Sequence, residues 1–175
     1  MNKIIVIGCP GSGKSTLVFK LQDLLGFPTM HLDKVYHIDN DTRISTEELI
    51  QKVDEFASSS DKWIIDGNYI STMEQRIKLA DTIILLDLDS NLCVENALAR
   101  SKKERQSDMA AGFDVSKISQ EFLDYIAKFK ESTLPRIMAY YETYKNEKEF
   151  IILKSYKEID EFYDGLKQKF SNEKM

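Results

Sequence analysis

Short apolar runs alternate along the chain with longer segments in which apolar residues recur at helical spacing. The runs cover residues 3–7, 28–33, 62–66, 80–88 and 150–153. The first intervening segment, residues 17–25, places its apolar side chains on one helical face and ends at Gly26. Strands that alternate with helices in this way predict an α/β fold, with a parallel sheet covered by helices on both faces.

Five further helical segments are expected after the second strand. A capping box at 45–48 predicts that a helix starts there. Further helices are expected at 73–79, at about 90–105, at about 118–144 with a break near 132–135 at Pro135, and around 159–170. Residues 35–40 are expected to be irregular, and the polar stretch 106–117 predicts a mobile lid within a lid-like segment of about 101–117.

The size and composition favour a single domain, residues 1–175, of an ordinary globular protein. Hydrophobic residues make up 42% of the chain and charged residues 30%, and no apolar run is long enough for a membrane span. The first strand begins without a signal peptide, and two cysteines, Cys9 and Cys93, suggest neither a disulfide framework nor a zinc site. We therefore expect a cytoplasmic protein. The net charge of −5 argues against non-specific binding to duplex DNA.

A glycine-rich segment, Gly8-Cys9-Pro10-Gly11-Ser12-Gly13-Lys14-Ser15-Thr16, follows the first strand directly. It has the phosphate-loop pattern of Gly, four residues and Gly-Lys-Ser. In such a loop the glycines let backbone N–H groups approach an anion, and the following helix adds its positive dipole end. Lys14 is expected to reach the β- and γ-phosphates, and Ser15 to hold Mg²⁺. The residues expected to bind the nucleotide are Gly8, Pro10, Gly11, Ser12, Gly13, Lys14, Ser15 and Thr16.

Carboxylates follow three later strands. Ligands of open parallel sheets bind beyond the carboxyl ends of the strands, which is where Asp33, Asp66 and Asp87 are expected. Asp66 or Asp87 would be the second anchor for Mg²⁺ beside Ser15, and the sequence leaves both open. Asp33 would accept a proton from a substrate hydroxyl or hold that hydroxyl in place.

Phosphoryl transfer needs cations around the group that moves. Besides Lys14, the candidates are Arg76, Arg100, Arg105 and Arg136. Arg76 is expected to fold back over the cleft, whereas Arg100 and Arg105 flank the start of the polar stretch and Arg136 follows it. Closure of residues 106–117 over the site would exclude water and favour transfer over hydrolysis.

The chain resembles the adenylate-kinase-like branch of phosphate-loop proteins and, more narrowly, the DNA topology modulation proteins (the FlaR-related group). The most distinctive shared piece is residues 63–69, Trp-Ile-Ile-Asp-Gly-Asn-Tyr. The other matching pieces are residues 8–16, 31–33, 76, 80–81, 86–87, 93, 108–112, 121–123 and 135–136. The resemblance implies a kinase-like core with strand order 2-3-1-4-5 and binding of ATP and Mg²⁺. It does not fix a substrate.

The leading hypothesis is an ATP-dependent kinase that acts on a small acceptor, such as a nucleoside or a nucleoside monophosphate. The alternative is a nucleotide-binding regulatory protein that influences DNA topology or gene expression without such catalysis. A translational-type GTPase is disfavoured because no Asn-Lys-x-Asp segment exists to read guanine. A zinc-lid adenylate kinase is disfavoured because residues 106–117 contain no cysteine.

Overall fold

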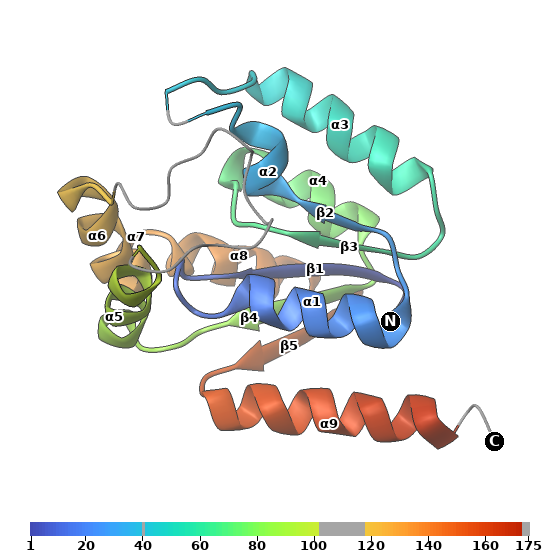
Figure 1. Cartoon of the computed structure of the whole chain (residues 1–175). Helices are drawn as coiled ribbons and strands as arrows, with labels where there is room; N and C mark the ends of the chain where they lie inside the picture. Colours follow the sequence, from blue (N-terminus) through green and yellow to red (C-terminus); the bar gives the residue numbers. More distant parts are fainter. Residues whose placement is uncertain (40, 102–117, 173–175) are drawn as a thin grey trace.

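Strand β1 (Lys3–Gly8) lies at the centre of a five-stranded sheet in which every strand is parallel to its neighbours (Figure 1). The order is β2-β3-β1-β4-β5. The other strands are β2 (Thr29–His31), β3 (Trp63–Asp66), β4 (Thr82–Leu86) and β5 (Glu149–Leu153). The computed structural model describes residues 1–39, 41–101 and 118–172. The predicted α/β class, parallel sheet and strand order are confirmed.

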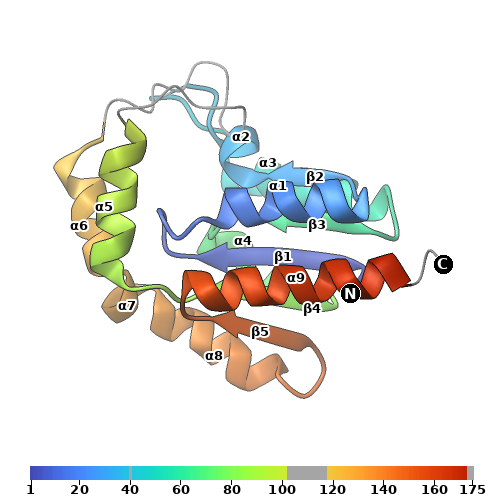
Figure 2. The same ribbon diagram turned by 60° about the horizontal axis from the view of Figure 1, so that its bottom comes forward.

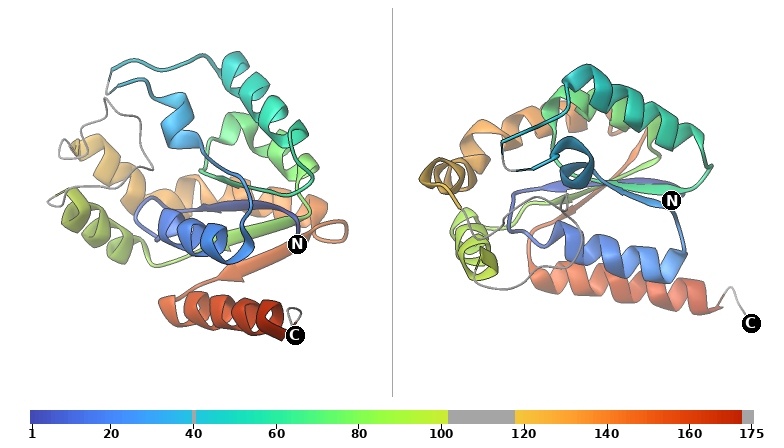
Figure 3. Two further views of the ribbon diagram at one scale, coloured as in Figure 1. Left: turned by 45° about the vertical axis from the view of Figure 1, so that its right-hand side comes forward. Right: turned by 45° about the horizontal axis from the view of Figure 1, so that its top comes forward.

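Helices cover both faces of the sheet (Figure 1 and Figure 3). On one face lie α1 (Lys14–Leu25) and α9 (Tyr156–Asn172), and on the other lie α3 (Thr46–Ser58), α4 (Ile70–Leu79) and α8 (Leu134–Tyr144). Helices α5 (Ser90–Ser101) and α6 (Gln120–Ala127) pack together beyond the carboxyl ends of the strands (Figure 2). They form a wall beside the edge of the sheet where ligands of such folds bind.

The inner strands form the centre of the core. Residues 4–7 of β1 and Ile64 and Ile65 of β3 are completely buried, and residues 82–86 of β4 are buried as well. A strand with helices on both faces has no solvated side, so its sequence is a continuous apolar run and not an alternation. The continuous apolar runs in the sequence therefore identified these strands correctly.

Two helix ends follow the local signals in the sequence. The Ser45 hydroxyl accepts a hydrogen bond from the backbone N–H of Glu48 at 3.0 Å, so the expected capping interaction starts α3. Helix α1 ends at Gly26, which adopts a left-handed conformation and donates its N–H to the Gln22 carbonyl at 2.8 Å.

The segment after β2 differs from the expectation. The sequence predicted a strand through Asp33, followed by irregular backbone at 35–40. The strand instead ends at His31, and α2 (Leu32–Tyr36) begins at once. Leu32 is completely buried against the core, and the helical turn that follows it places Asp33 at the edge of the sheet.

Two further boundaries were predicted only in part. Helix α4 begins at Ile70, three residues before the expected start, and its first turns bury Thr72 and Met73. The segment 118–144 contains α6, α7 (Phe129–Ser132) and α8. The break at Thr133 falls in the predicted range, but the break at Lys128, which the sequence did not indicate, separates α6 from α7.

The lid-like segment, residues 101–117, lies outside the described residues except for Ser101. Within the described ranges, no helix has both the length and the apolar character that crossing a membrane requires.

A pair of glycine substitutions tests how closely the loop after β1 packs. Gly11 and Gly26 both have positive φ, 87° and 69°. A Cβ at Gly11 would lie 2.2 Å from the Cys93 carbonyl oxygen, whereas a Cβ at Gly26 would meet nothing within 4 Å. We expect Gly26→Ala to lower the free energy of unfolding by about 1–2 kcal/mol, and Gly11→Ala to lower it clearly more. Urea unfolding measures both, and equal losses would contradict the packing.

Candidate functional site

The glycine-rich loop, residues 8–16, connects β1 to α1. The Lys14 ammonium folds back on this loop and donates hydrogen bonds to the carbonyl oxygens of Gly8, at 2.9 Å, and Cys9, at 3.0 Å. Burial lowers the pKa of this ammonium, while the carboxylates of Asp66 and Asp33 act in the opposite direction. The one lysine of the loop is thus bound to the loop's own backbone and lines the same cavity as both carboxylates.

The turn after β3 is tied to the start of the loop. Parallel pairing sets Val6 beside Asp66, and the Gly67 N–H donates to the Val6 carbonyl at 3.2 Å. The side-chain amide of Asn68 then pairs with the backbone of Gly8. Its oxygen accepts from the Gly8 N–H at 3.0 Å, and its nitrogen donates to the Gly8 carbonyl at 2.7 Å. Asn68 therefore holds the backbone of Gly8, the first residue of the loop, from a segment sixty residues away.

Arg76 does not lie where the sequence placed it. Its side chain is completely buried and donates to the carbonyl oxygens of Gly67, Asn68 and Tyr69 at 2.8, 2.6 and 3.1 Å. Burial lowers its pKa to about 10, so the guanidinium remains cationic at neutral pH. The expected approach to a moving phosphoryl group is corrected to a structural role, because the guanidinium is bound to the turn and does not line the cavity.

Asp33, the second residue of α2, is held at the site by Tyr69. The Tyr69 hydroxyl donates to a carboxylate oxygen of Asp33 at 2.7 Å, and its ring packs edge-on against Tyr36 with the centroids 4.9 Å apart. Burial, together with the Asp33 charge, raises the pKa of the Tyr69 phenol, so the phenol stays a proton donor to the carboxylate. This contact fixes the orientation of the candidate proton acceptor.

Asp66, at the end of β3, lies beside the same loop. It is buried, with 4% of its surface exposed, and one of its oxygens lies 3.0 Å from the Nδ1 atom of His31. The sheet register pairs His31 directly with Asp66, and the His31 ring packs against Phe19. The neighbouring strand thus orients this carboxylate.

A cavity of about 690 Å³ brings these groups together. Its walls come from the glycine-rich loop, α2 and the segment after it, the turn after β3, and helices α5 and α6. The sequence-predicted residues that line it are Pro10, Gly11, Gly13, Lys14, Ser15, Asp33, Asp66 and Arg100. The aromatic side chains that line it are Tyr36, Tyr69, Phe122 and Tyr125.

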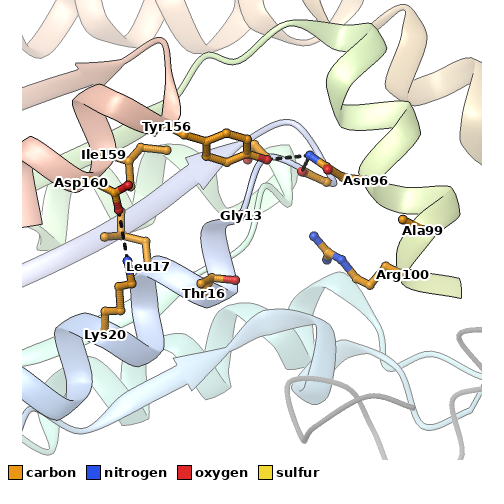
Figure 4. Close-up of a pocket in the computed structure, with 12 residues that line it drawn as sticks. Gly13, Thr16, Leu17, Lys20, Asn96, Ala99, Arg100, Tyr156, Ile159 and Asp160 are labelled. Carbon is orange, nitrogen blue, oxygen red and sulfur yellow. Dashed lines mark hydrogen bonds and ion pairs between the residues drawn. The ribbon is translucent and has the colours of Figure 1, made fainter. Parts of the chain in front are cut away.

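A smaller hollow, of about 310 Å³, lies beside the loop, between α1, α5 and α9 (Figure 4). Thr16, Asn96, Arg100 and Tyr156 line it, with apolar contributions from Leu17 and Ile159. Asn96 donates to the Gly11 carbonyl at 2.9 Å and to the Tyr156 hydroxyl at 2.6 Å. The hollow therefore combines an aromatic ring, an apolar floor and polar groups beside the loop.

The two candidate metal carboxylates are placed differently. Asp66 lines the large cavity together with Ser15. Asp87 lines neither hollow, and its carboxylate forms an ion pair with Lys130 of α7 at 3.3 Å. Of the two carboxylates that the sequence left open, Asp66 thus shares a cavity with Ser15, whereas Asp87 is paired with a residue of α7.

The predicted arginines also differ in whether they line a hollow. Arg100, on α5, lines both hollows, and Figure 4 shows its side chain extending toward the loop. Arg136 is exposed on α8 and lines neither hollow, so the fold does not place it at the cleft as the sequence predicted. Arg105 lies outside the described residues.

The residues present fit a nucleotide and Mg²⁺. Gly11 and Gly13 both have positive φ, a backbone conformation that glycine adopts without strain and that phosphate loops use. The Ser12 hydroxyl is completely buried and has no hydrogen-bond partner among the described residues. A hydroxyl from Ser15 and a carboxylate from Asp66 are hard oxygen donors. Mg²⁺ prefers such donors when phosphates supply further ligands.

Comparison with known proteins adds no family to this geometry. No protein-family model matches the chain, and no curated protein matches it at a significant level.

Several residues of the site were not assigned from the sequence. Asn68 and Tyr69 belong to the most distinctive segment, residues 63–69, and the pair Gly67-Asn68 after a strand was a usable signal for a turn at a ligand edge. Arg43 and Tyr156 had no such signal, because their places in the cavity walls depend on how distant elements pack.

The structural role of Arg76 can be tested by unfolding. We expect Arg76→Met to lower the free energy of unfolding by at least about 3 kcal/mol, because the turn carbonyls lose their charged donor inside the protein. Lys78→Met, an exposed cation on the same helix, should have little effect. Urea unfolding measures both. A stable Arg76→Met protein that has lost only catalysis would restore the role that the sequence suggested.

Proposed function

We propose that the protein is an ATP-dependent phosphotransferase related to the adenylate-kinase-like proteins, which transfers the γ-phosphoryl group to a small acceptor. The acceptor is a nucleoside or a nucleotide-type compound that carries a hydroxyl or a phosphate. The resemblance to DNA topology modulation proteins is part of this proposal.

One observation carries the proposal. The two hollows meet at the glycine-rich loop and share three lining residues, Gly11, Gly13 and Arg100. A transferase must hold a donor and an acceptor at the same time, with the moving group between them. Two hollows that meet at a phosphate-loop motif supply that arrangement, whereas binding of one nucleotide would need only one of them.

The smaller hollow suits the nucleoside end of ATP. Its Tyr156 ring and the apolar side chains of Leu17 and Ile159 offer a surface for a base, and Thr16 at the start of α1 adds a hydroxyl. A ligand placed there would direct its phosphates along the N-terminal end of α1, where the backbone N–H groups and the helix dipole favour negative charge.

The larger cavity suits the acceptor and the reaction. Asp33 has the position and the oriented carboxylate to accept a proton from an acceptor hydroxyl, and the rings of Tyr36 and Tyr69 beside it would contact a planar group. Lys14 and Arg100 would stabilise the charge that develops on the transferred group. Mg²⁺ held by Ser15 and Asp66 would, when bound, neutralise charge on the β- and γ-phosphates.

The direct test is conversion of ATP to ADP with Mg²⁺ across nucleosides, nucleoside monophosphates and small hydroxyl metabolites. Acceptor-dependent turnover with a phosphorylated product identifies the kinase and its substrate class. Tight MgATP binding without turnover on any acceptor would contradict the proposal and favour the regulatory alternative.

The loop lysine gives the first prediction for this assay. We expect Lys14→Ala to lower the transfer rate by about 10²–10³-fold while leaving the protein folded, because it removes a preorganised cation from the transferred charge. Circular dichroism checks the fold. A folded Lys14→Ala protein with normal turnover would exclude catalysis through the loop.

Asp33 gives a second prediction, which separates chemistry from binding. We expect Asp33→Asn to lower the transfer rate by about 10²-fold or more and to change MgATP affinity by only a few-fold. Tyr69→Phe is the matched control, since it removes the hydroxyl that orients Asp33 but keeps the carboxylate, and its loss should be tenfold at most. Equal losses of rate and affinity in Asp33→Asn would make Asp33 a structural residue.

A further inference from the structure

The Lys14 ammonium is bound to the glycine-rich loop itself. It donates to the carbonyl oxygens of Gly8 and Cys9 at 2.9 and 3.0 Å. In the proposed function, on which this inference rests, the same ammonium must turn toward the phosphates of ATP. Binding of a triphosphate therefore draws a donor away from two carbonyl groups, and Gly8 and Cys9 are both buried residues. A buried carbonyl left without a donor is costly.

Each of these two carbonyls has a second donor. The Cys9 carbonyl accepts from the backbone N–H of Ser12 at 3.1 Å, a bond made within the loop. The Gly8 carbonyl accepts from the side-chain nitrogen of Asn68 at 2.7 Å, a bond supplied by the turn after β3. Both carbonyls would thus keep a hydrogen bond after Lys14 has moved, but for Gly8 that bond depends on one side chain.

We propose that Asn68 is a positioning residue whose amide keeps the Gly8 carbonyl hydrogen-bonded when the Lys14 ammonium leaves it for the phosphates of a bound nucleotide. Asn68 thereby lowers the cost of releasing the lysine. It acts on the phosphate end of the ligand and not on the nucleoside end, because it lines only the larger cavity and makes no contact with the smaller hollow.

The orientation of the Asn68 amide is determined by its two bonds. Its oxygen accepts from the Gly8 N–H at 3.0 Å while its nitrogen faces the Gly8 carbonyl. A flipped amide would set donor against donor and acceptor against acceptor, so only this orientation satisfies both groups. The amide is therefore a fixed donor to the carbonyl.

The backbone that carries Asn68 is also held in place. Arg76 donates to the Asn68 carbonyl at 2.6 Å. Tyr69, the next residue, has a φ of 22° and is the one non-glycine residue with positive φ in the part of the chain that the structure describes. Such a conformation persists only where surrounding contacts impose it, and here the contacts come from Arg76 to the Tyr69 carbonyl and from the Tyr69 hydroxyl to Asp33. Asn68 is thus supported from both sides.

The test compares the affinities for MgATP and for adenosine, measured by calorimetry on the wild-type protein and on Asn68→Ala. We expect the affinity ratio of MgATP to adenosine to fall by about 5- to 100-fold in Asn68→Ala, the range for one unpaired buried acceptor, with adenosine affinity nearly unchanged. Asn68→Leu removes the same bonds while keeping most of the volume. It gives the same comparison if the alanine variant does not fold.

Asn96→Ala is the matched control. Asn96 also donates its amide to a carbonyl of the loop, that of Gly11 at 2.9 Å, whereas the Lys14 ammonium donates to the carbonyls of Gly8 and Cys9. Because Asn96 lines the smaller hollow, its loss should weaken MgATP and adenosine alike and leave their ratio unchanged.

The outcomes separate this inference from the proposed function. A lower ratio in both Asn68 variants and not in Asn96→Ala supports the role of Asn68. An unchanged ratio in a folded Asn68 variant, or equal losses for the two ligands, overturns it while leaving the proposed function in place. A wild-type protein that binds no MgATP overturns the proposed function and this inference together.

Discussion

The central position of β1 is the constraint on which the rest of the structure depends. This strand pairs with β3 on one side and with β4 on the other, both in parallel. The segments that follow all three strands therefore leave at the same edge of the sheet. The register sets Val6 beside Asp66 and Gly8 beside Leu86, which places the glycine-rich loop between the turn after β3 and the start of α5.

The turn after β3 shows how a buried charge supports a site without facing it. Among the residues that the structure describes, no carboxylate accepts a hydrogen bond from Arg76; its guanidinium instead binds carbonyl oxygens of residues 67–69. A buried cation is tolerated when its donors are satisfied, and here they fix a turn with strained backbone at Tyr69. This turn also presents the Asn68 side chain to the loop and the Tyr69 hydroxyl to Asp33.

The loop is also packed closely from the side of α5. The backbone of Gly11 approaches Cys93 so nearly that no Cβ could be accommodated, and Asn96, one helical turn later, donates to the Gly11 carbonyl. The loop is thus held by one asparagine at its start and by another near its middle, on opposite sides. Lys14 and Ser15, at the N-terminal end of α1, then line the larger cavity, whereas Thr16 lines the smaller hollow.

The sequence by itself determined the features that depend on neighbouring residues. Apolar runs identified the strands, the capping serine and Gly26 marked helix ends, and the glycine-rich loop appeared as a continuous motif. The strand order was an expectation from family resemblance, because local patterns do not specify which strands pair. Only the tertiary structure placed Asp66 in a cavity with Ser15, paired Asp87 with Lys130 and bound Arg76 to the turn. The reason is physical: a charged side chain looks the same in sequence whether it faces a ligand, an ion-pair partner from a distant helix or a buried carbonyl. Its role depends on which of these the fold brings within hydrogen-bonding distance.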